Sequence, residues 1–155
     1  MDIKIPRLQV SVKVFFHHYG LEACDFFLAE NSERHTGPET MDEFLNFDPR
    51  EFIPVRLQES GNIMLISKKF IETVLVPSDS KALGDMHGVP PTRETQVRVT
   101  MTDERTYQGV IRIFNPAYEA RVTDFLNAPE PFFQLQLPEQ VAYINKLYLS
   151  RLEEV

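Results

Sequence analysis

The chain has 155 residues, 43% of them hydrophobic and 25% charged, so it is long enough for one domain or two small ones and has a soluble globular composition. Its net charge of -7 argues against a surface that binds nucleic-acid backbones regardless of sequence, because such a surface needs clustered Lys and Arg. The single cysteine, Cys24, excludes an intramolecular disulfide. With no signal-peptide pattern and no apolar run of ~20 residues, we expect a cytoplasmic protein that does not enter a membrane.

The first part of the chain predicts strands with one buried face. Apolar and polar side chains alternate in VSVKV, and a second strand starts at Gly20. Two further strand regions follow a short motif with helical character. The strand regions are residues 10–14, 20–30, 52–57 and 62–74.

That short motif, DEFLN at residues 42–46, recurs as TDFLN at residues 123–127. In each copy a Thr or Asp can cap a helix by accepting from free backbone N–H groups, and the Asn suits a left-handed exit. The candidate caps are Thr40, Asp42, Thr123 and Asp124, and the candidate exits are Asn46 and Asn127. We expect each motif to be a short helical plug that closes one end of a bent sheet.

The repeat extends well beyond this motif. FIPVRL at residues 52–57 matches FFQLQL at 132–137, and NIMLISKKFIETV at 62–74 matches QVAYINKLYLSRL at 140–152 without a gap. The upstream strands VSVKV and VRVTM agree more weakly. The sequence therefore predicts an internal duplication.

Between the matched parts, residues 77–94 are rich in Pro, Gly, Ser and Asp, which is typical of a linker. We expect copy one at residues 1–76, the linker at 77–94 and copy two at 95–155. Copy one has an additional loop, NSERHTGPET at residues 31–40, and we expect the tip of this loop to be the most mobile segment of the copy.

The order of a V-x-V strand, a strand such as GVIRIF starting at Gly109, a strand pair and a terminal INKLYLSRL resembles small SH3-like or Sm-like β-barrels. The resemblance implies a mainly β protein with two tandem copies of such a barrel, each with one short helix. It also implies a tight 3-10 turn before each last strand, with Phe70, Ile71, Tyr148 and Leu149 where the barrels close.

The RxxDFLN pattern from Arg121 is also similar to short bacterial domains of unknown function. Two other relationships fit less well. The base-reading and basic loop residues of Sm-type RNA binders have no equivalent here, and neither do the RxxxR and [DN]xSxxG elements of PilZ-type cyclic-dinucleotide domains. Fold resemblance gives an architecture, and function has to come from sites.

No catalytic motif is present, so we expect no enzyme, no catalytic residue and no cofactor. His17 and His18 are adjacent and would point to opposite faces of a strand, which disfavours a shared metal. Cys24 has the acidic neighbours Glu22 and Asp25, which raise rather than lower a thiol pKa, and we expect a buried, unreactive side chain.

The unusual feature of the composition is twelve Phe and no Trp. Most should fill two small cores, but some occur in runs that cannot all point inward. We expect these to form an interaction surface, either between the copies or with another protein. The candidates are Phe26, Phe27, Phe47, Phe114 and Tyr118.

The sequence thus predicts a protein-binding or adaptor module in a bacterial cytoplasmic assembly, with an unidentified protein partner or a homo-oligomer. One alternative is single-stranded nucleic-acid binding through stacking of Phe114, Tyr118 and Tyr107, which the net charge makes the weaker interpretation. Another alternative is small-molecule sensing in a pocket between the copies.

Overall fold

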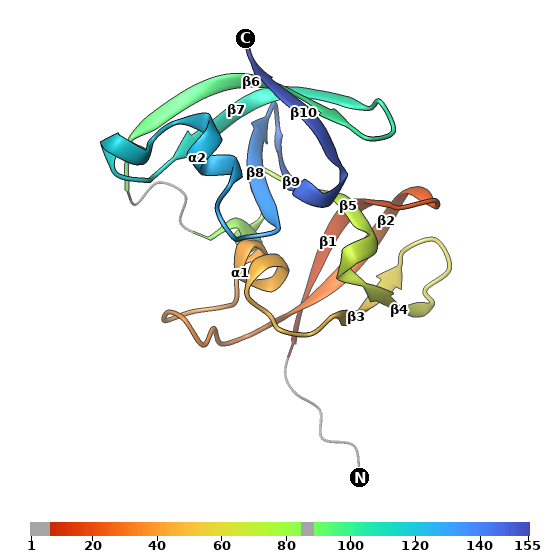
Figure 1. The fold of residues 1–155 in the computed structure, drawn as a ribbon. Helices are drawn as coiled ribbons and strands as arrows, with labels where there is room; N and C mark the ends of the chain where they lie inside the picture. Colours follow the sequence, from red (N-terminus) through yellow and green to blue (C-terminus); the bar gives the residue numbers. More distant parts are fainter. Residues whose placement is uncertain (1–6, 85–88) are drawn as a thin grey trace.

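The computed structural model describes residues 7–84 and 89–155, which form ten strands and two short α-helices (Figure 1). The first half contains β1 (Arg7–Phe16), β2 (Gly20–Ala29), α1 (Met41–Asn46), β3 (Phe52–Leu57), β4 (Ile63–Ser67), the 3-10 turn η1 (Lys68–Phe70) and β5 (Ile71–Pro77). The second half contains β6 (Arg93–Met101), β7 (Thr106–Ile113), η3 (Ala117–Glu119), α2 (Val122–Leu126), β8 (Phe132–Leu137), β9 (Gln140–Asn145), η4 (Lys146–Tyr148) and β10 (Leu149–Glu154). Between the halves lies η2 (Lys81–Leu83).

All ten strands belong to one antiparallel sheet with the order β10-β6-β7-β8-β9-β5-β1-β2-β3-β4. The protein is therefore mainly β with two short helices, as the sequence predicted. The halves share one internal order, because β5-β1-β2-β3-β4 and β10-β6-β7-β8-β9 correspond strand by strand. They are joined where β5 pairs with β9, from Thr73 opposite Ile144 to Pro77 opposite Gln140.

Each half has its own apolar core, and each core takes side chains from the other half. The first core includes Phe132, Val141 and Tyr143, and the second includes Leu75. These residues lie on or beside the β5–β9 joint, so both halves bury surface against each other. The predicted boundaries at residues 76 and 95 stay a prediction, since one sheet runs through both parts.

The predicted linker is structured at both ends. β5 continues to Pro77, β6 begins at Arg93, and Ala82 and Leu83 of η2 are buried in the first core. Ala82 and Leu83 are close enough to the end of β5 to pack into the first core, to which β5 also contributes. Residues 85–88 of the linker lie outside the described residues.

Helix α1 begins with a capping box that the sequence predicted only in part. The Thr40 side chain accepts from the Glu43 backbone, and the Glu43 side chain accepts from the Thr40 backbone. Asp42 is therefore not the cap. The expected left-handed exit at Asn46 is wrong, because Asn46 belongs to the helix and Phe47, the C-cap, has φ of -120°.

Helix α2 also differs from the expectation. Its N-cap is Arg121, with no side-chain hydrogen bond to the backbone, and Asp124 is instead ion-paired with Arg121. Asn127 is the C-cap with φ of -89°, so it too is outside the left-handed region. Its side chain donates to the Thr123 carbonyl and satisfies the helix end without a change of hand.

The tight 3-10 turns before β5 and β10 are present where the resemblance implied them. Ile71 and Tyr148 are buried beside these turns, while Phe70 is exposed. Gly109 lies inside β7 rather than at its start, and a Cβ there would lie 2.3 Å from the Gln136 carbonyl oxygen. A glycine is needed at this point because β7 and β8 approach closely. In the described ranges, no helix combines the length and the apolarity that a membrane crossing needs.

Candidate functional site

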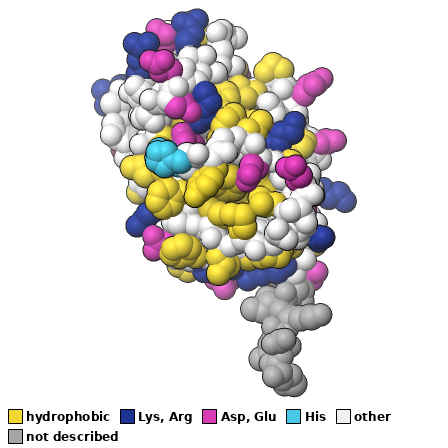
Figure 2. All heavy atoms as spheres, turned by 90° about the vertical axis from the view of Figure 1, so that its right-hand side faces the viewer, with side chains coloured by type: hydrophobic (Ala, Val, Ile, Leu, Met, Phe, Trp, Pro, Cys, Tyr) yellow, Lys and Arg dark blue, Asp and Glu magenta, His cyan; other side chains and the backbone are white. Residues whose placement is uncertain are grey.

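Five large apolar side chains are exposed along one edge of the first half, on β3, β4 and η1. We call them the β4 edge: Phe52, Ile63, Met64, Leu65 and Phe70. Figure 2 faces the side of the molecule on which β3 and β4 lie in Figure 1, and hydrophobic side chains gather across it. Contiguous exposed apolar surface on a folded protein typically marks an interaction site.

The matching positions of the second half are buried. They are occupied by Phe132, Val141, Ala142, Tyr143 and Tyr148. The exposed fraction is 72% for Leu65 but 0% for the matching Tyr143, and 52% for Phe70 but 8% for the matching Tyr148. The difference follows from the joint, because β5 pairs with β9 and α1 contacts β8. Across residues 7–84 and 89–155, β4 pairs with β3 alone.

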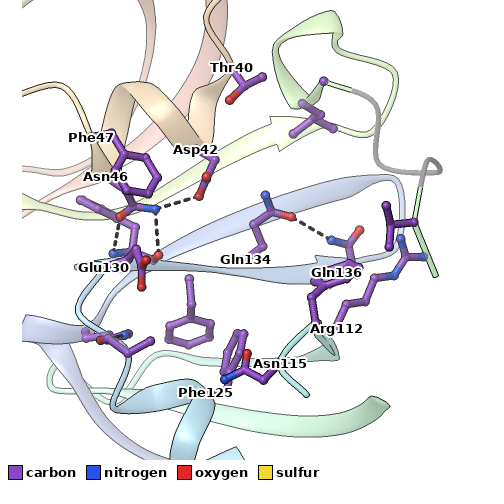
Figure 3. Close-up of a pocket in the computed structure, with 18 of the residues that line it drawn as sticks. Thr40, Asp42, Asn46, Phe47, Arg112, Asn115, Phe125, Glu130, Gln134 and Gln136 are labelled. Carbon is purple, nitrogen blue, oxygen red and sulfur yellow. Dashed lines mark hydrogen bonds between the residues drawn. The ribbon is translucent and has the colours of Figure 1, made fainter. Parts of the chain in front are cut away.

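A hollow of about 660 Å³ lies between the two halves (Figure 3). Asp42 and Asn46 reach it from α1, and Gln134 and Gln136 face them from β8. Aromatic side chains from both halves complete its walls: Phe47, Phe114, Phe125, Phe132 and Phe133. Such a mixture of aromatic surface and a few polar groups is typical of a small-molecule site.

Asn46 fixes one wall of this hollow to the other half. Its Nδ2 donates to Asp42 Oδ1 at 2.8 Å and to the Phe132 carbonyl at 3.1 Å, and its Oδ1 accepts from the Phe132 backbone N–H at 2.9 Å. One side-chain amide thus satisfies both backbone groups of the first residue of β8. The matching Asn127 donates to Thr123 of its own helix and, among the described residues, to no group of the other half.

The charged groups of the hollow include both signs. Burial raises the pKa of Asp42 above its ordinary value, with Glu130 adding to the effect. Burial lowers the pKa of Lys146, whose Nζ donates to the Ala128 carbonyl at 2.8 Å. Arg112 Nε lies 3.2 Å from Glu94 Oε1, but the geometry is not that of a hydrogen bond, and this buried N–H has no acceptor in the described chain.

The five aromatic residues predicted to form an interaction surface do not lie together. Phe26 is fully buried against Phe44 in the first core, so the structure contradicts an exposed position for it. Phe27 is half-buried. Phe47 and Phe114 both line the hollow, and Tyr118 is 79% exposed away from it. A role of the four outer residues in binding a partner stays a prediction.

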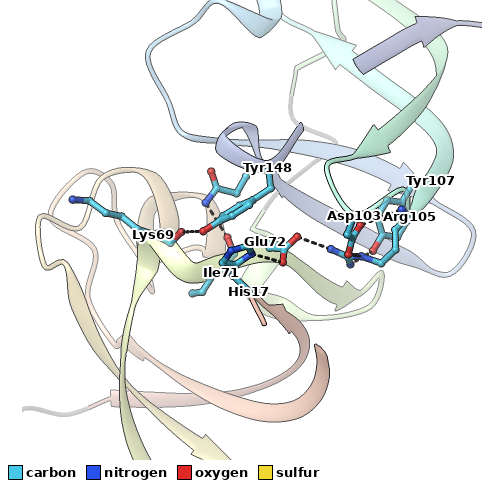
Figure 4. A network of polar contacts seen from close by, with 9 residues as sticks. His17, Lys69, Ile71, Glu72, Asp103, Arg105, Tyr107 and Tyr148 are labelled. Atoms are coloured by element: carbon cyan, nitrogen blue, oxygen red, sulfur yellow. Dashed lines mark hydrogen bonds and ion pairs between the residues drawn. The ribbon is translucent and has the colours of Figure 1, made fainter. Parts of the chain in front are cut away.

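A polar network crosses the joint between the halves (Figure 4). Glu72 Oε2 lies 3.2 Å from His17 Nδ1 and Glu72 Oε1 lies 3.0 Å from Arg105 Nη2, and Glu72 is 5% exposed. Asn145 Nδ2 donates to the Ile71 carbonyl at 2.8 Å, and Tyr148 Oη donates to the Lys69 carbonyl at 2.6 Å. The Arg105 guanidinium also lies 3.7 Å from the Phe15 ring centre. These contacts hold β5 and η1 against the second half.

The cysteine and the histidines that were considered as reactive groups or metal ligands lie in a core and in a turn. Burial raises the pKa of the Cys24 thiol to about 12, with Asp25 and Glu22 adding to it, which confirms a buried side chain with little thiolate character. β1 ends at Phe16, so His17 and His18 lie in a turn with ring centres 3.8 Å apart, rather than on opposite faces of a strand. Within the described residues, no group of three or more His, Cys, Asp or Glu is placed to hold a metal.

Comparisons of the chain with protein families, with curated protein sequences and with solved structures found no match. The candidate sites therefore rest on geometry alone. Of these, the β4 edge and the hollow were both missed as sets of residues by sequence reasoning. NIMLIS has four consecutive apolar side chains beside a polar turn, and this run was a usable signal for an edge with both faces apolar.

Proposed function

We propose that the chain is a non-catalytic protein-binding module that acts as an adaptor in a bacterial cytoplasmic assembly. We also propose that its halves are tandem copies of a small SH3-like or Sm-like barrel, which the shared strand order supports. The β4 edge is the observation that carries the function. Its side chains are exposed at positions where the second half uses the equivalent side chains to contact another part of the protein.

The expected mode of binding is addition of a strand. The outer side of β4 has no strand beside it in the described ranges, so its free backbone N–H and C=O groups can pair with a partner. Apolar side chains on β4 then add contacts on both faces of the sheet. The β5–β9 joint shows the same kind of strand pairing within the molecule.

A photo-crosslinking amino acid in place of Leu65 tests this proposal in cells that make the protein. We expect crosslinks to a defined protein from this position and none from the same amino acid in place of Leu21, an exposed leucine on β2 that lies outside the β4 edge. Equal yields at both positions, or none at Leu65, would count against the β4 edge as the binding surface.

The hollow supports a second candidate function, the binding of a small molecule between the halves. The aromatic walls and the paired carboxamides of Gln134 and Gln136 favour a flat ligand with hydrogen-bonding groups at its edge. A ligand at one hundred times its Kd should stabilise the fold by about 2.7 kcal/mol. Thermal unfolding measured across a metabolite panel should reveal it, and Gln134→Leu should remove the response. A flat response across the panel argues against this second function.

A further inference from the structure

Four sets of contacts form the joint between the halves: one main-chain pairing and three side-chain hydrogen bonds. The outer strands of the sheet carry residues that match those of the joint. The β5–β9 pairing is the main-chain part of the joint. Three side chains donate to backbone carbonyls across the joint: Asn46 of the first half to Phe132, and Asn145 and Tyr148 of the second half to Ile71 and Lys69. β5 with α1 and η1 forms one side of this joint, and β9 with β8 and η4 forms the other.

Both sides of this joint occur a second time in the chain. By strand order, β10 corresponds to β5 and β4 corresponds to β9, and these are the two outer strands of the sheet. In the part of the chain that the structure describes, β10 pairs only with β6 and β4 only with β3. The molecule therefore presents one copy of each side of the joint at opposite ends of its sheet.

Ser67 indicates that the β4 side is an incomplete joint. It matches Asn145, whose amide reaches across the joint to the Ile71 carbonyl. Ser67 is 7% exposed and its Oγ has no hydrogen-bond partner in the described chain. A buried hydroxyl without a partner costs free energy, and Ser67 stands at the position where the internal joint supplies a carbonyl. The carbonyl equivalent to that of Ile71 belongs to Leu149 of β10.

The exposed side chains on the two ends also match the internal joint. Phe70 matches Tyr148, which lies against η1 at Lys69, and the residue equivalent to Lys69 is Leu147. Phe70 is 52% exposed and Leu147 is 66% exposed, so each is an apolar group without cover. Asn127 likewise matches Asn46, and the exposed Phe52 matches Phe132.

We propose that the partner of the β4 edge is a second copy of this chain, which adds its β10 edge in the register of the β5–β9 joint. Leu152 of one copy would then lie opposite Leu65 of the next, and Glu153 opposite Met64. This inference rests on the proposed protein-binding function and names its partner. The contact joins unlike surfaces, so repeated addition builds a ring if the rotation closes and a filament if it does not.

The β10 edge is more polar than β5, and this difference determines how strongly we expect two copies to associate. Arg151, Glu153 and Glu154 replace Thr73, Leu75 and Val76, while Glu153 and Glu154 are already paired with Arg98 at 2.9 Å and Arg93 at 2.5 Å. Charged side chains on an edge strand limit pairing with other chains. We therefore expect the contact between copies to be weaker than the internal joint and to depend on protein concentration.

Two single-cysteine variants test the register directly. Met64→Cys and Glu153→Cys change exposed residues, and the internal pair at these positions, Leu75 and Ala142, is directly opposed. Opposed strand residues have the separation that a disulfide requires. When the two full-length variants are mixed under oxidising conditions, we expect the 64–153 disulfide at about ten times the yield of either homodimer, identified by mass spectrometry of the linked peptides. Cys24 is buried and does not compete.

Three other results would each overturn the inference. Predominance of the 64–64 disulfide would show a two-fold contact between β4 strands. A 64–153 yield no higher than that of Met64→Cys mixed with Tyr118→Cys would show that copies do not meet here. Sedimentation gives the third result. If the wild-type protein sediments as a monomer at all concentrations, as Leu65→Lys is expected to do, the copies do not associate. Leu21→Lys is the matched control for a Leu→Lys change on the surface. Each of these leaves the Leu65 photo-crosslink to another protein intact, so failure of self-association and failure of the proposed function are distinguishable.

Discussion

At the residue scale, Glu43 ties the 31–40 loop to helix α1. Its carboxylate lies 2.6 Å from both Ser32 Oγ and His35 Nε2 and accepts from the Thr40 N–H at 3.0 Å. His35 Nδ1 also lies 3.0 Å from the Thr36 carbonyl, so both ring nitrogens face acceptors. That carbonyl and Glu43 raise the pKa of His35 and favour the charged ring. The loop whose tip was predicted to be the most mobile part of copy one is thus anchored at Ser32, His35 and Thr40.

Replacing Glu43 with Gln should lower the free energy of unfolding by about 1–2 kcal/mol, because the amide N–H₂ cannot accept from Ser32 and His35 while the capping box is weakened. Urea unfolding of the two proteins measures the difference. Glu33→Gln, an exposed change in the same loop, should be within about 0.5 kcal/mol of the wild type. A similar loss in both variants would contradict the assignment.

The stability difference between the wild type and Glu43→Gln should depend on pH. Burial alone would raise the pKa of Glu43, but hydrogen bonds from Ser32, Thr40 and His35 outweigh it and hold the pKa below the ordinary 4.5. A carboxyl with a lowered folded-state pKa stabilises the fold above its unfolded pKa and loses that contribution as the pH falls through the folded one. The stability difference between wild type and Glu43→Gln should therefore shrink below about pH 4.5. A difference that is constant from pH 7 to pH 3 would show that the charge is not involved.

Asn46 and Asn127 form a matched pair with different roles. Asn46→Ala removes three hydrogen bonds and leaves two backbone groups of Phe132 unpaired, so we expect a loss of about 2–3 kcal/mol in unfolding free energy. Asn127→Ala removes one exposed bond within its own helix and should cost about 0.5 kcal/mol or less. Chemical denaturation of both variants tests this, and equal losses would argue against Asn46 as a link between the halves.

At the element scale, β4 and β9 have the same place in their halves but different neighbours. β9 lies between β8 and β5, while β4 is an outer strand. A chain edge with apolar residues is an aggregation hazard unless something covers it. The apolar run of β4 therefore makes the isolated molecule prone to aggregation. A partner that covers β4 would remove this hazard, which favours a binding role.

Alanine at the matched positions should separate the two elements. Tyr143→Ala should cost about 3–5 kcal/mol, because it leaves a cavity in the first core. Leu65→Ala should change stability by no more than about 0.5 kcal/mol, because the side chain is in solvent. Thermal unfolding at low protein concentration measures both. A large loss for Leu65→Ala at low concentration would mean that the β4 edge is covered within the single chain.

At the scale of the whole molecule, the halves are joined by more than a linker. Main-chain pairing, shared core residues and the Glu72 network all cross the joint. The hollow lies between the same two halves, so its shape depends on the joint. Any ligand bound there would contact both halves and stabilise their relative position.

We expect the protein to unfold in one cooperative transition, since neither half can expose the β5–β9 joint without also exposing part of both cores. In calorimetry the measured enthalpy should equal the van't Hoff enthalpy. Val99→Ala, a change in the second core, should reduce the hydrogen-exchange protection of β1 amides as much as that of β6 amides. Two separate transitions, or loss of protection in β6 alone, would show independent halves.

Much of the architecture was predictable because strand signals and repeats are local. Alternating apolar residues located the strands, the ungapped match of residues 62–74 to 140–152 set the correspondence of β4 with β9, and the 3-10 turns followed from the resemblance. The predicted cap of α2 and the predicted exits of both helices were wrong. Asn46 bonds to Phe132, which is 86 residues away in the sequence, whereas Asp124 pairs with Arg121 and Asn127 bonds to Thr123, which are local contacts that residue propensities do not distinguish from caps and exits.

By itself, the sequence determined the mainly β class, the element order and the buried state of Cys24, since each depends on residue type and close neighbours. Only the tertiary structure decided that the halves share one sheet, that Phe26 lies inside while Leu65 lies outside, and that a hollow forms between α1 and β8. The physical reason is that two strands at matching positions can be buried or exposed according to what pairs with their outer side. Local sequence does not record that neighbour.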